Sequence, residues 1–244
     1  MTTCDSDNYC SDRVSPSLEI LLQNKSREID LSYNAISNTT LSFAHPEDFI
    51  SPLLSLQLHH NQISDISFLQ HFRYLEHVDL SHNIIQHLPL DVFDNLCYLD
   101  TIDLSHNIIS SCSSSNPDSS PKSTSLLRLG NNRLDSACLD VIFSYFPNLF
   151  FCHLEFNLIK TIPTSFGNLQ GLQHLDLSNN ESLIISDYSV FSKCYNLISV
   201  NLLNTPSAFN LAELISVLPT LTVFNEKQLC SRKKVDLRSF KEKF

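Results

Sequence analysis

Apolar and polar positions along this chain follow a nine-residue pattern that returns many times. The clearest copy, residues 99–107, fits L-x-x-L-x-L-x-x-N. Because side chains alternate across a strand, Ile102 and Leu104 point inward while the residues between them point outward. Asn107 ends the copy, where its amide can bond backbone groups that a bend leaves unpaired. The pattern predicts a short strand followed by a turn.

The copies align on the polar residue that closes each of them. These residues are Asn34, Asn61, Asn83, Asn107, Asn132, Asn157, Asn180 and Thr205. Successive positions lie 22 to 27 residues apart, a spacing that chance copies would not maintain. The chain therefore contains about eight units of one structural repeat.

The repeated unit resembles the leucine-rich repeat superfamily over roughly residues 25–227. This resemblance implies an α/β fold, a curved right-handed solenoid of about eight repeats. A parallel β-sheet would line its concave side, and a mixture of helices and turns its convex side. Each coil packs only against its neighbours, so a cap is expected at each end.

We divide the chain into five segments. They are a disordered N-terminus (1–14), an N-terminal helical cap (15–24), the leucine-rich repeats (25–205), a C-terminal cap (206–230) and a basic tail (231–244). Pro16 suits the first position of the N-terminal helix. The tail either folds back on acidic surface, acts as a targeting patch or is simply solvated.

The C-terminal cap has two parts. Four apolar residues are spaced as on an amphipathic helix: Leu211, Leu214, Ile215 and Leu218. Residues 219–227 are similar to the "LPxLxxLD" cap of intracellular leucine-rich repeat proteins, although Phe224 and Asn225 replace the usual Leu-Asp. That group includes the protein phosphatase 1 regulatory-subunit, U2 ribonucleoprotein A-prime and axonemal dynein light-chain types.

Two segments predict different convex connections. Residues 110–125 are rich in Ser, Pro, Asn and Asp, and Cys112 is almost their only apolar side chain. We expect a flexible surface loop there, either plainly solvated or phosphorylated at Ser120, which precedes a proline. Residues 137–146 instead predict a helix that ends before Pro147.

The net charge indicates which partners the chain can bind, and its first residues bear on its location in the cell. A formal net charge of −10 disfavours nonspecific binding to nucleic acid or anionic lipid and permits a basic partner. A run of 18 apolar residues is missing, so a membrane span is not expected. The polar first residues favour a cytoplasmic or nuclear protein. A missing leader would instead allow an extracellular one, with glycans at Asn24, Asn38 or Asn180.

The eight cysteines fit either location. Cys97, Cys138, Cys152 and Cys194 lie near apolar places of the repeats, and we expect buried free thiols there. Cys4 and Cys10 precede the repeats. A bond between them would resemble the disulfide cap of secreted leucine-rich repeat proteins.

The sequence predicts no enzyme, cofactor or metal site. It lacks G-x-S-x-G, P-loop and H-E-x-x-H motifs, and it has only 3 glycines. His60, His82 and His106 occupy one place in three successive coils. At a strand spacing of about 4.8 Å, these rings could share a metal or sense pH. The alternative, which we favour, is that Ser-His-Asn simply fills a solvated turn.

Projection onto the concave side gives the candidate binding residues. The central outward column includes Asp79, Asp103, Arg128, His153 and Asp176, and Leu126 and Phe151 lie side by side in the next column, near Glu155 and Phe156. Aromatic residues with arginine in polar surroundings are typical of an interface centre. Alternatively, Phe156 turns inward at the coil corner, Phe151 is half covered, and the aspartates serve solubility.

These features predict a non-enzymatic protein–protein interaction scaffold or regulatory subunit. Its concave surface in repeats three to seven would bind a protein partner, and the charge permits a basic one. We expect a monomer that binds neither nucleic acid nor membrane. The alternative is an extracellular recognition or adhesion module whose signal peptide is missing.

Overall fold

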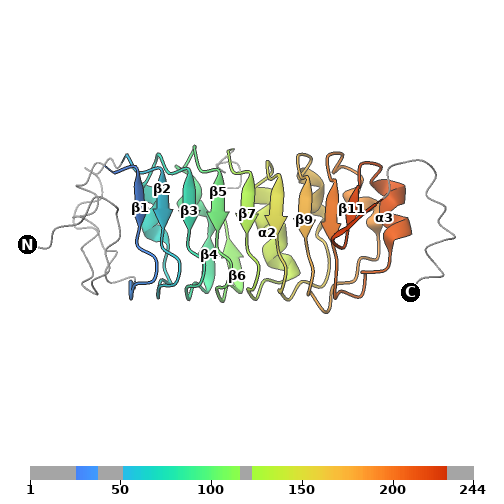
Figure 1. The fold of residues 1–244 in the computed structure, drawn as a ribbon, viewed down its shortest axis with the longest axis horizontal. Coiled ribbons are helices and arrows are strands. Elements are labelled where there is room, and N and C mark those ends of the chain that lie inside the picture. Colours follow the sequence, from blue (N-terminus) through green and yellow to red (C-terminus); the bar gives the residue numbers. More distant parts are fainter. Residues whose placement is uncertain (1–25, 38–51, 116–122, 230–244) are drawn as a thin grey trace, which may run out of the picture.

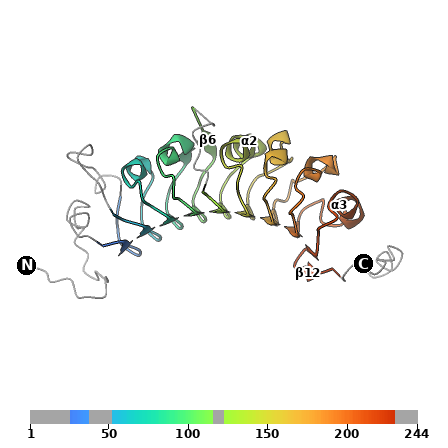
Figure 2. The same ribbon diagram turned by 90° about the horizontal axis from the view of Figure 1, so that it is seen from above.

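A computed structural model describes residues 26–37, 52–115 and 123–229 as one row of stacked coils (Figure 1). Seen from above, the row forms an arc with its strands on the concave side and its helices on the convex side (Figure 2). Several predictions lie outside the described residues. They concern segments 1–14, 15–24 and 231–244, Cys4, Cys10, Asn24, Asn38 and Ser120.

The concave sheet has ten strands within the described residues. In spatial order they are β1 (Glu28–Asp30), β2 (Ser55–Gln57), β3 (His77–Asp79), β5 (Thr101–Asp103), β7 (Leu126–Arg128), β8 (Phe151–His153), β9 (His174–Asp176), β10 (Ser199–Asn201), β11 (Val223–Phe224) and β12 (Lys227–Gln228). Neighbours pair in parallel except β11 and β12, which are antiparallel. Within the concave sheet, the middle residue of each strand from β2 to β10 is buried, as the alternation predicts.

The convex side mixes short 3₁₀ helices with α-helices. The 3₁₀ helices are η3 (Ser67–His71), η4 (Leu90–Phe93), η6 (Thr164–Asn168) and η7 (Tyr188–Phe191), and the α-helices are α2 (Ser136–Tyr145) and α3 (Leu211–Val217). Helix α2 matches the predicted helix to within one residue at each end. It begins after Asp135, whose side chain accepts a hydrogen bond from the Cys138 N–H.

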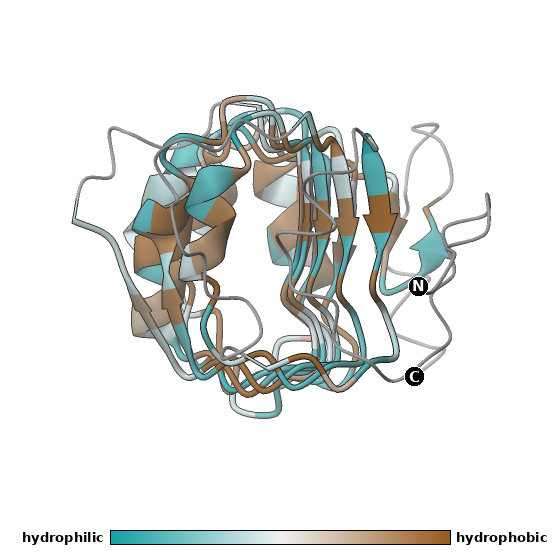
Figure 3. Cartoon of the chain, turned by 90° about the vertical axis from the view of Figure 1, so that its left-hand side faces the viewer, coloured by the Kyte–Doolittle hydropathy of each residue, from teal (hydrophilic) through white to brown (hydrophobic). Residues whose placement is uncertain are grey.

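The core lies between the strands and the convex helices, which form opposite walls of each coil (Figure 3). Three buried phenylalanines connect successive convex elements. The ring of Phe166 in η6 lies 5.5 Å from that of Phe143 in α2 and 5.0 Å from that of Phe191 in η7. Apolar contacts thus join each coil to its neighbours on the convex side as well as in the sheet.

The predicted asparagine ladder joins the coils at the turn after each strand. The Asn107 amide donates to the carbonyls of Leu104 in its own coil and Leu80 in the preceding coil, each at 3.0 Å. Its oxygen accepts from the Ile85 N–H at 3.0 Å. The same three kinds of bond recur at Asn61, Asn83, Asn132, Asn157 and Asn180.

The ladder changes at the eighth repeat. Thr205 occupies the asparagine place and donates only within its coil, to the Leu202 carbonyl. The Ser207 hydroxyl accepts the Ile185 N–H instead. Two side chains therefore replace one asparagine, which explains why the sequence pattern weakens there.

Residues 111–113, within the segment predicted as a loop, form a strand instead. Residues Ser111–Ser113 form β6, which pairs in parallel with β4 (His87–Pro89) on the convex side. The two ring nitrogens of His87 lie 2.8 and 2.9 Å from the hydroxyls of Ser111 and Ser113. Serine side chains thus support a strand here, and residues 116–122 lie outside the described part.

The cysteines follow the prediction with one exception. Cys138, Cys152 and Cys194 are buried free thiols, whereas Cys97 is free but exposed. Cys97 follows buried Leu96 in the turn after η4, where the next side chain faces solvent.

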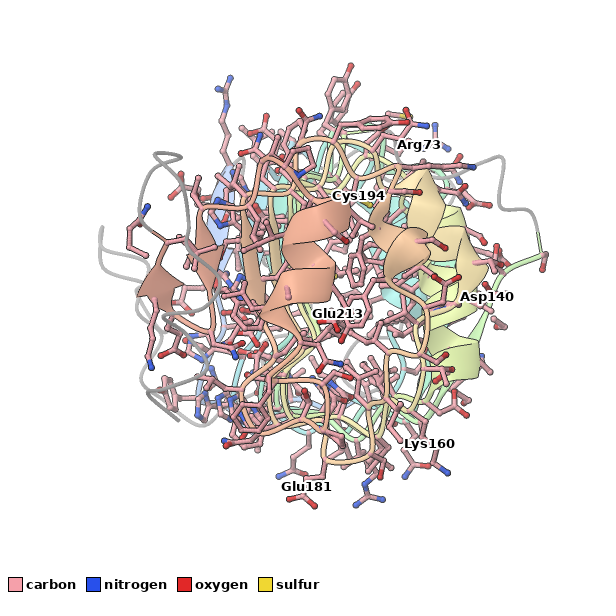
Figure 4. The ribbon with its side chains drawn as sticks, turned by 90° about the vertical axis from the view of Figure 1, so that its right-hand side faces the viewer. Arg73, Asp140, Lys160, Glu181, Cys194 and Glu213 are labelled. Carbon is pink, nitrogen blue, oxygen red and sulfur yellow. The ribbon has the colours of Figure 1, made fainter. Side chains whose placement is uncertain are left out.

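The C-terminal end of the row carries the predicted amphipathic helix. Figure 4 looks onto this end and shows α3, with Glu213, in front of the earlier coils. Asn225 accepts a hydrogen bond from the Leu202 N–H at 2.7 Å, so this residue of the cap motif bonds to the last repeat. The segment boundaries stay predictions. No helix in the described parts of the chain is long and apolar enough to cross a membrane.

Candidate functional site

The parallel register puts the candidate residues into rows across the concave sheet. Asp79, Asp103, Arg128, His153 and Asp176 are register partners from β3 to β9. Arg128 is exposed, and the other four are partly buried. The row brings acidic, basic and imidazole groups together on one face, as the sequence predicted.

The aspartates of this row also hold the turns that follow their strands. The carboxylates of Asp79, Asp103 and Asp176 each accept a hydrogen bond, at 2.8 to 3.0 Å, from the N–H of the serine two residues later. Such a bond shapes a turn whether or not a partner binds. Arg128 also lies 3.5 Å from Asp103. Part of the acidic pattern is therefore structural.

An apolar patch lies beside this row. Leu126 and Phe151 are register partners, and the Phe151 ring stacks on His174 with centroids 4.7 Å apart and planes 6° apart. Phe151 is 37% exposed and Phe156 is 52% exposed. Phe156 therefore does not turn inward, which was one of the alternatives. We define Leu126, Phe151 and His174 as the apolar patch; Phe156, with a φ of 54°, lies in the turn after β8, at the position that His106 occupies in an earlier coil.

A group of potential metal ligands lies next to the apolar patch. His153, Glu155 and Asp176 each offer a ligand atom within 4.8 Å of the others. His174, a register partner of Phe151, was left out of the sequence-based site. Asn201, which donates to Asp176 at 3.0 Å, was also left out. Both stand in the outward columns that the sequence predicts, but their contacts with Phe151 and Asp176 depend on side-chain conformation, which projection does not give.

The histidines at the turn edge form a stack. The rings of Tyr33, His60, His82 and His106 follow one another with centroid distances of 4.3, 4.0 and 4.1 Å. All four residues have positive φ, between 53° and 57°. In such a stack the ring nitrogens lie side by side and do not point toward one centre. Among the described residues, the histidines of the stack do not form a group of three ligand atoms that could hold one metal ion.

The histidine stack predicts acid sensitivity. Burial and the neighbouring rings of His106 and His60 lower the pKa of His82 below its usual 6.5, while Asp79 acts in the opposite direction. Below pH 6.5 the unfolded chain therefore binds more protons at this residue than the folded chain. The contribution of His82 to the stability of the folded chain is therefore complete above pH 6.5 and decreases as the pH falls below this value.

His82→Asn tests this, because asparagine tolerates positive φ and carries no charge. In thermal denaturation at pH 7 and pH 5, we expect the melting temperature of the His82→Asn variant to fall less between the two pH values than that of the native chain. Parallel profiles for the two proteins would contradict the expectation.

Comparison with known proteins agrees with this geometry. The family model for the leucine-rich repeat matches residues 74–96. An internalin (inlF) from Listeria monocytogenes is similar in structure, with a TM-score of 0.60 and 20% identity over 83% of this chain and 54% of that chain. A sequence search of curated proteins found no match.

A chain of the Drosophila Toll–Spatzle complex is also similar, with a TM-score of 0.55 and 26% identity over 63% of this chain and 22% of that chain. The present chain thus spans about half of the internalin chain and less of the second one. The coil pattern, the sheet and these likenesses agree: the chain has the fold of a leucine-rich repeat solenoid.

Proposed function

We propose that this chain binds a protein partner on its concave face, between β3 and β9. The observation that carries the proposal is the apolar patch, in which Phe151 is exposed yet held flat against His174. A rigid aromatic side chain loses little conformational freedom on binding. Such side chains at the centre of a polar surface often supply most of an interface's binding energy.

The charges around the apolar patch favour a partner with basic groups. Asp79 and Asp103 lie on β3 and β5, and the chain carries a net charge of −10. Acidic surface of this kind attracts cationic side chains and repels phosphate backbones and anionic lipid. Because Arg128 already lies beside Asp103, we assign the stronger attraction to Asp79.

The chain would act as a non-enzymatic, monomeric scaffold or regulatory subunit. The complex of Toll with Spatzle is named for a protein partner, which fits this class of function. We propose a location in the cytoplasm or nucleus, which is supported by the free thiols of the five cysteines within the described residues, Cys97, Cys112, Cys138, Cys152 and Cys194. Disulfides in protein from the native source would favour the extracellular alternative.

Phe151→Asp tests the site. A partner captured from a lysate of the source cells is titrated against purified native and variant chains. We expect Phe151→Asp to weaken binding about 100-fold, which corresponds to a hot-spot residue. Phe209→Asp is the control, because Phe209 is 80% exposed outside the sheet, and its affinity should be unchanged.

Asp79→Asn and Asp103→Asn refine the test, since asparagine can still accept the serine N–H. When both substitutions are combined, the loss of two negative charges should weaken binding of the partner and reduce the dependence of that binding on salt. The proposal fails if the partner binds the native and Phe151→Asp chains equally well and if the asparagine variants show unchanged salt dependence. The binding site would then lie on another face of the chain.

A further inference from the structure

Three potential metal ligands converge at the C-terminal side of the apolar patch. His153 and Glu155 are two residues apart and point to the same side, because side chains alternate along an extended segment. Asp176 is the register partner of His153 on β9. One ligand atom from each residue lies within 4.8 Å of the other two. The group mixes an imidazole with two carboxylates, so it is more than an acidic cluster.

One oxygen of this group is buried without a partner. The Oε2 atom of Glu155 is out of solvent and has no hydrogen-bond donor, although the side chain as a whole is 25% exposed. The Nδ1 atom of His153 is 4.0 Å away, which is too long for a hydrogen bond. A buried carboxylate oxygen is costly unless a cation or a proton compensates it. A cation between Oε2 and Nδ1 would satisfy both atoms.

Gly130 gives the Glu155 carboxylate its position. A Cβ atom at Gly130 would overlap this carboxylate, with its Cδ only 2.5 Å away. Gly130 does not have a positive φ, so the close approach explains the glycine better than backbone conformation does. The corresponding place in the preceding coil is Ser105. The sequence thus pairs a glycine in one coil with a glutamate in the next.

Asp176 is held in a fixed orientation by its own neighbours. Its Oδ1 atom accepts the Ser178 N–H at 2.8 Å, and its Oδ2 atom accepts the Asn201 amide at 3.0 Å. Each carboxylate oxygen retains a second lone pair for a metal. Hydrogen bonds that orient a ligating carboxylate are common outside the ligand shell of metal sites. The positive charge nearest in the row, Arg128, lies beside Asp103.

From these observations we infer that His153, Glu155 and Asp176 bind a divalent transition-metal ion such as Zn²⁺. One imidazole nitrogen and two carboxylate oxygens suit zinc, whereas calcium and magnesium prefer oxygen ligands alone. Zinc bonds of about 2.0–2.1 Å require tetrahedral ligands to lie about 3.3 Å apart, so the side chains close slightly around the ion. A fourth position stays open. The inference does not rest on the proposed partner, although the site lies on the same concave face.

Titration of the metal-free full chain with Zn²⁺ alone tests the inference, by calorimetry and by the absorption of a Co²⁺ substitute. We expect one ion per chain at this site and a cobalt spectrum of nitrogen and oxygen ligands, without the band of thiolate ligation. His153→Gln and Glu155→Gln should each weaken binding at least about tenfold. Gly130→Ala retains all three ligands but displaces the Glu155 carboxylate, so it should also weaken binding.

His77→Gln is the matched control, since His77 is an exposed histidine on β3 of the same sheet. Its affinity for Zn²⁺ should equal that of the native chain. Circular dichroism verifies that each variant is folded. The inference fails if Zn²⁺ does not bind, or if Glu155→Gln and Gly130→Ala bind as tightly as the native chain. It also fails if His82→Asn alone abolishes binding, because the ion would then lie on the histidine stack.

Discussion

Replacement of Asn107 by alanine is expected to lower the free energy of unfolding by about 3–5 kcal/mol. The side chain donates to the carbonyls of Leu80 and Leu104 and accepts the N–H of Ile85, all at 3.0 Å. Alanine would leave the Ile85 N–H buried without this acceptor, whereas the carbonyls of Leu80 and Leu104 would each lose one bond and keep the one from Asn83 or Asn132. A buried N–H left without an acceptor costs about 1–3 kcal/mol, and each of the two bonds lost at the carbonyls adds about 0.5–1.5 kcal/mol.

Urea denaturation followed by circular dichroism measures this loss. Asn196→Ala is the control, because Asn196 is exposed and donates to the Gln170 carbonyl. Its free energy of unfolding should change by less than about 1 kcal/mol. If the two variants lost equally little stability, the asparagine ladder would not be a main connection between the coils.

The concave side could be predicted because its pattern is local and repeated. Residues equivalent to Ile102, Leu104 and Asn107 occur in the other coils and contact equivalent neighbours there. The pattern of one nine-residue copy therefore predicts the conformation of the others. The unchanged register then places the outward residues in rows. For this reason the positions of Asp79 and Arg128 on one face followed from the sequence alone.

The convex side follows no such rule. The pairing of β6 with β4 depends on His87, which lies 24 and 26 residues before its partners Ser111 and Ser113. A polar run such as residues 110–115 is typical of a loop unless a side chain from another coil bonds to it. The exposure of Cys97 likewise depends on how the turn after η4 is oriented.

Within the site, the sequence predicted which face a residue occupies but could not predict its side-chain conformation. The stacking of Phe151 on His174 and the outward position of Phe156 are decided by packing between coils. The same holds for the Glu155 carboxylate over Gly130. The sequence placed Glu155 among the candidate residues, but periodicity could not show that one of its oxygens is buried.

Replacement of Phe166 by alanine is expected to cost about 3–5 kcal/mol, the usual range for a buried phenylalanine. Phe166 is fully buried and contacts the rings of Phe143 and Phe191 in the coils on either side. A cavity at this place therefore weakens two interfaces between coils. Phe209→Ala is the control: its side chain is 80% exposed, so its effect should stay within about 0.5 kcal/mol.

The shape of the unfolding curve gives the second readout for Phe166→Ala. In a row of coils that contact only their neighbours, cooperativity depends on every interface. We expect the weakened row to unfold in parts, so that the urea midpoint falls and the apparent slope of free energy against urea decreases. A loss below about 1 kcal/mol with an unchanged slope would contradict this. The coils would then be joined mainly through the sheet and the asparagine ladder, and the phenylalanines would only fill space.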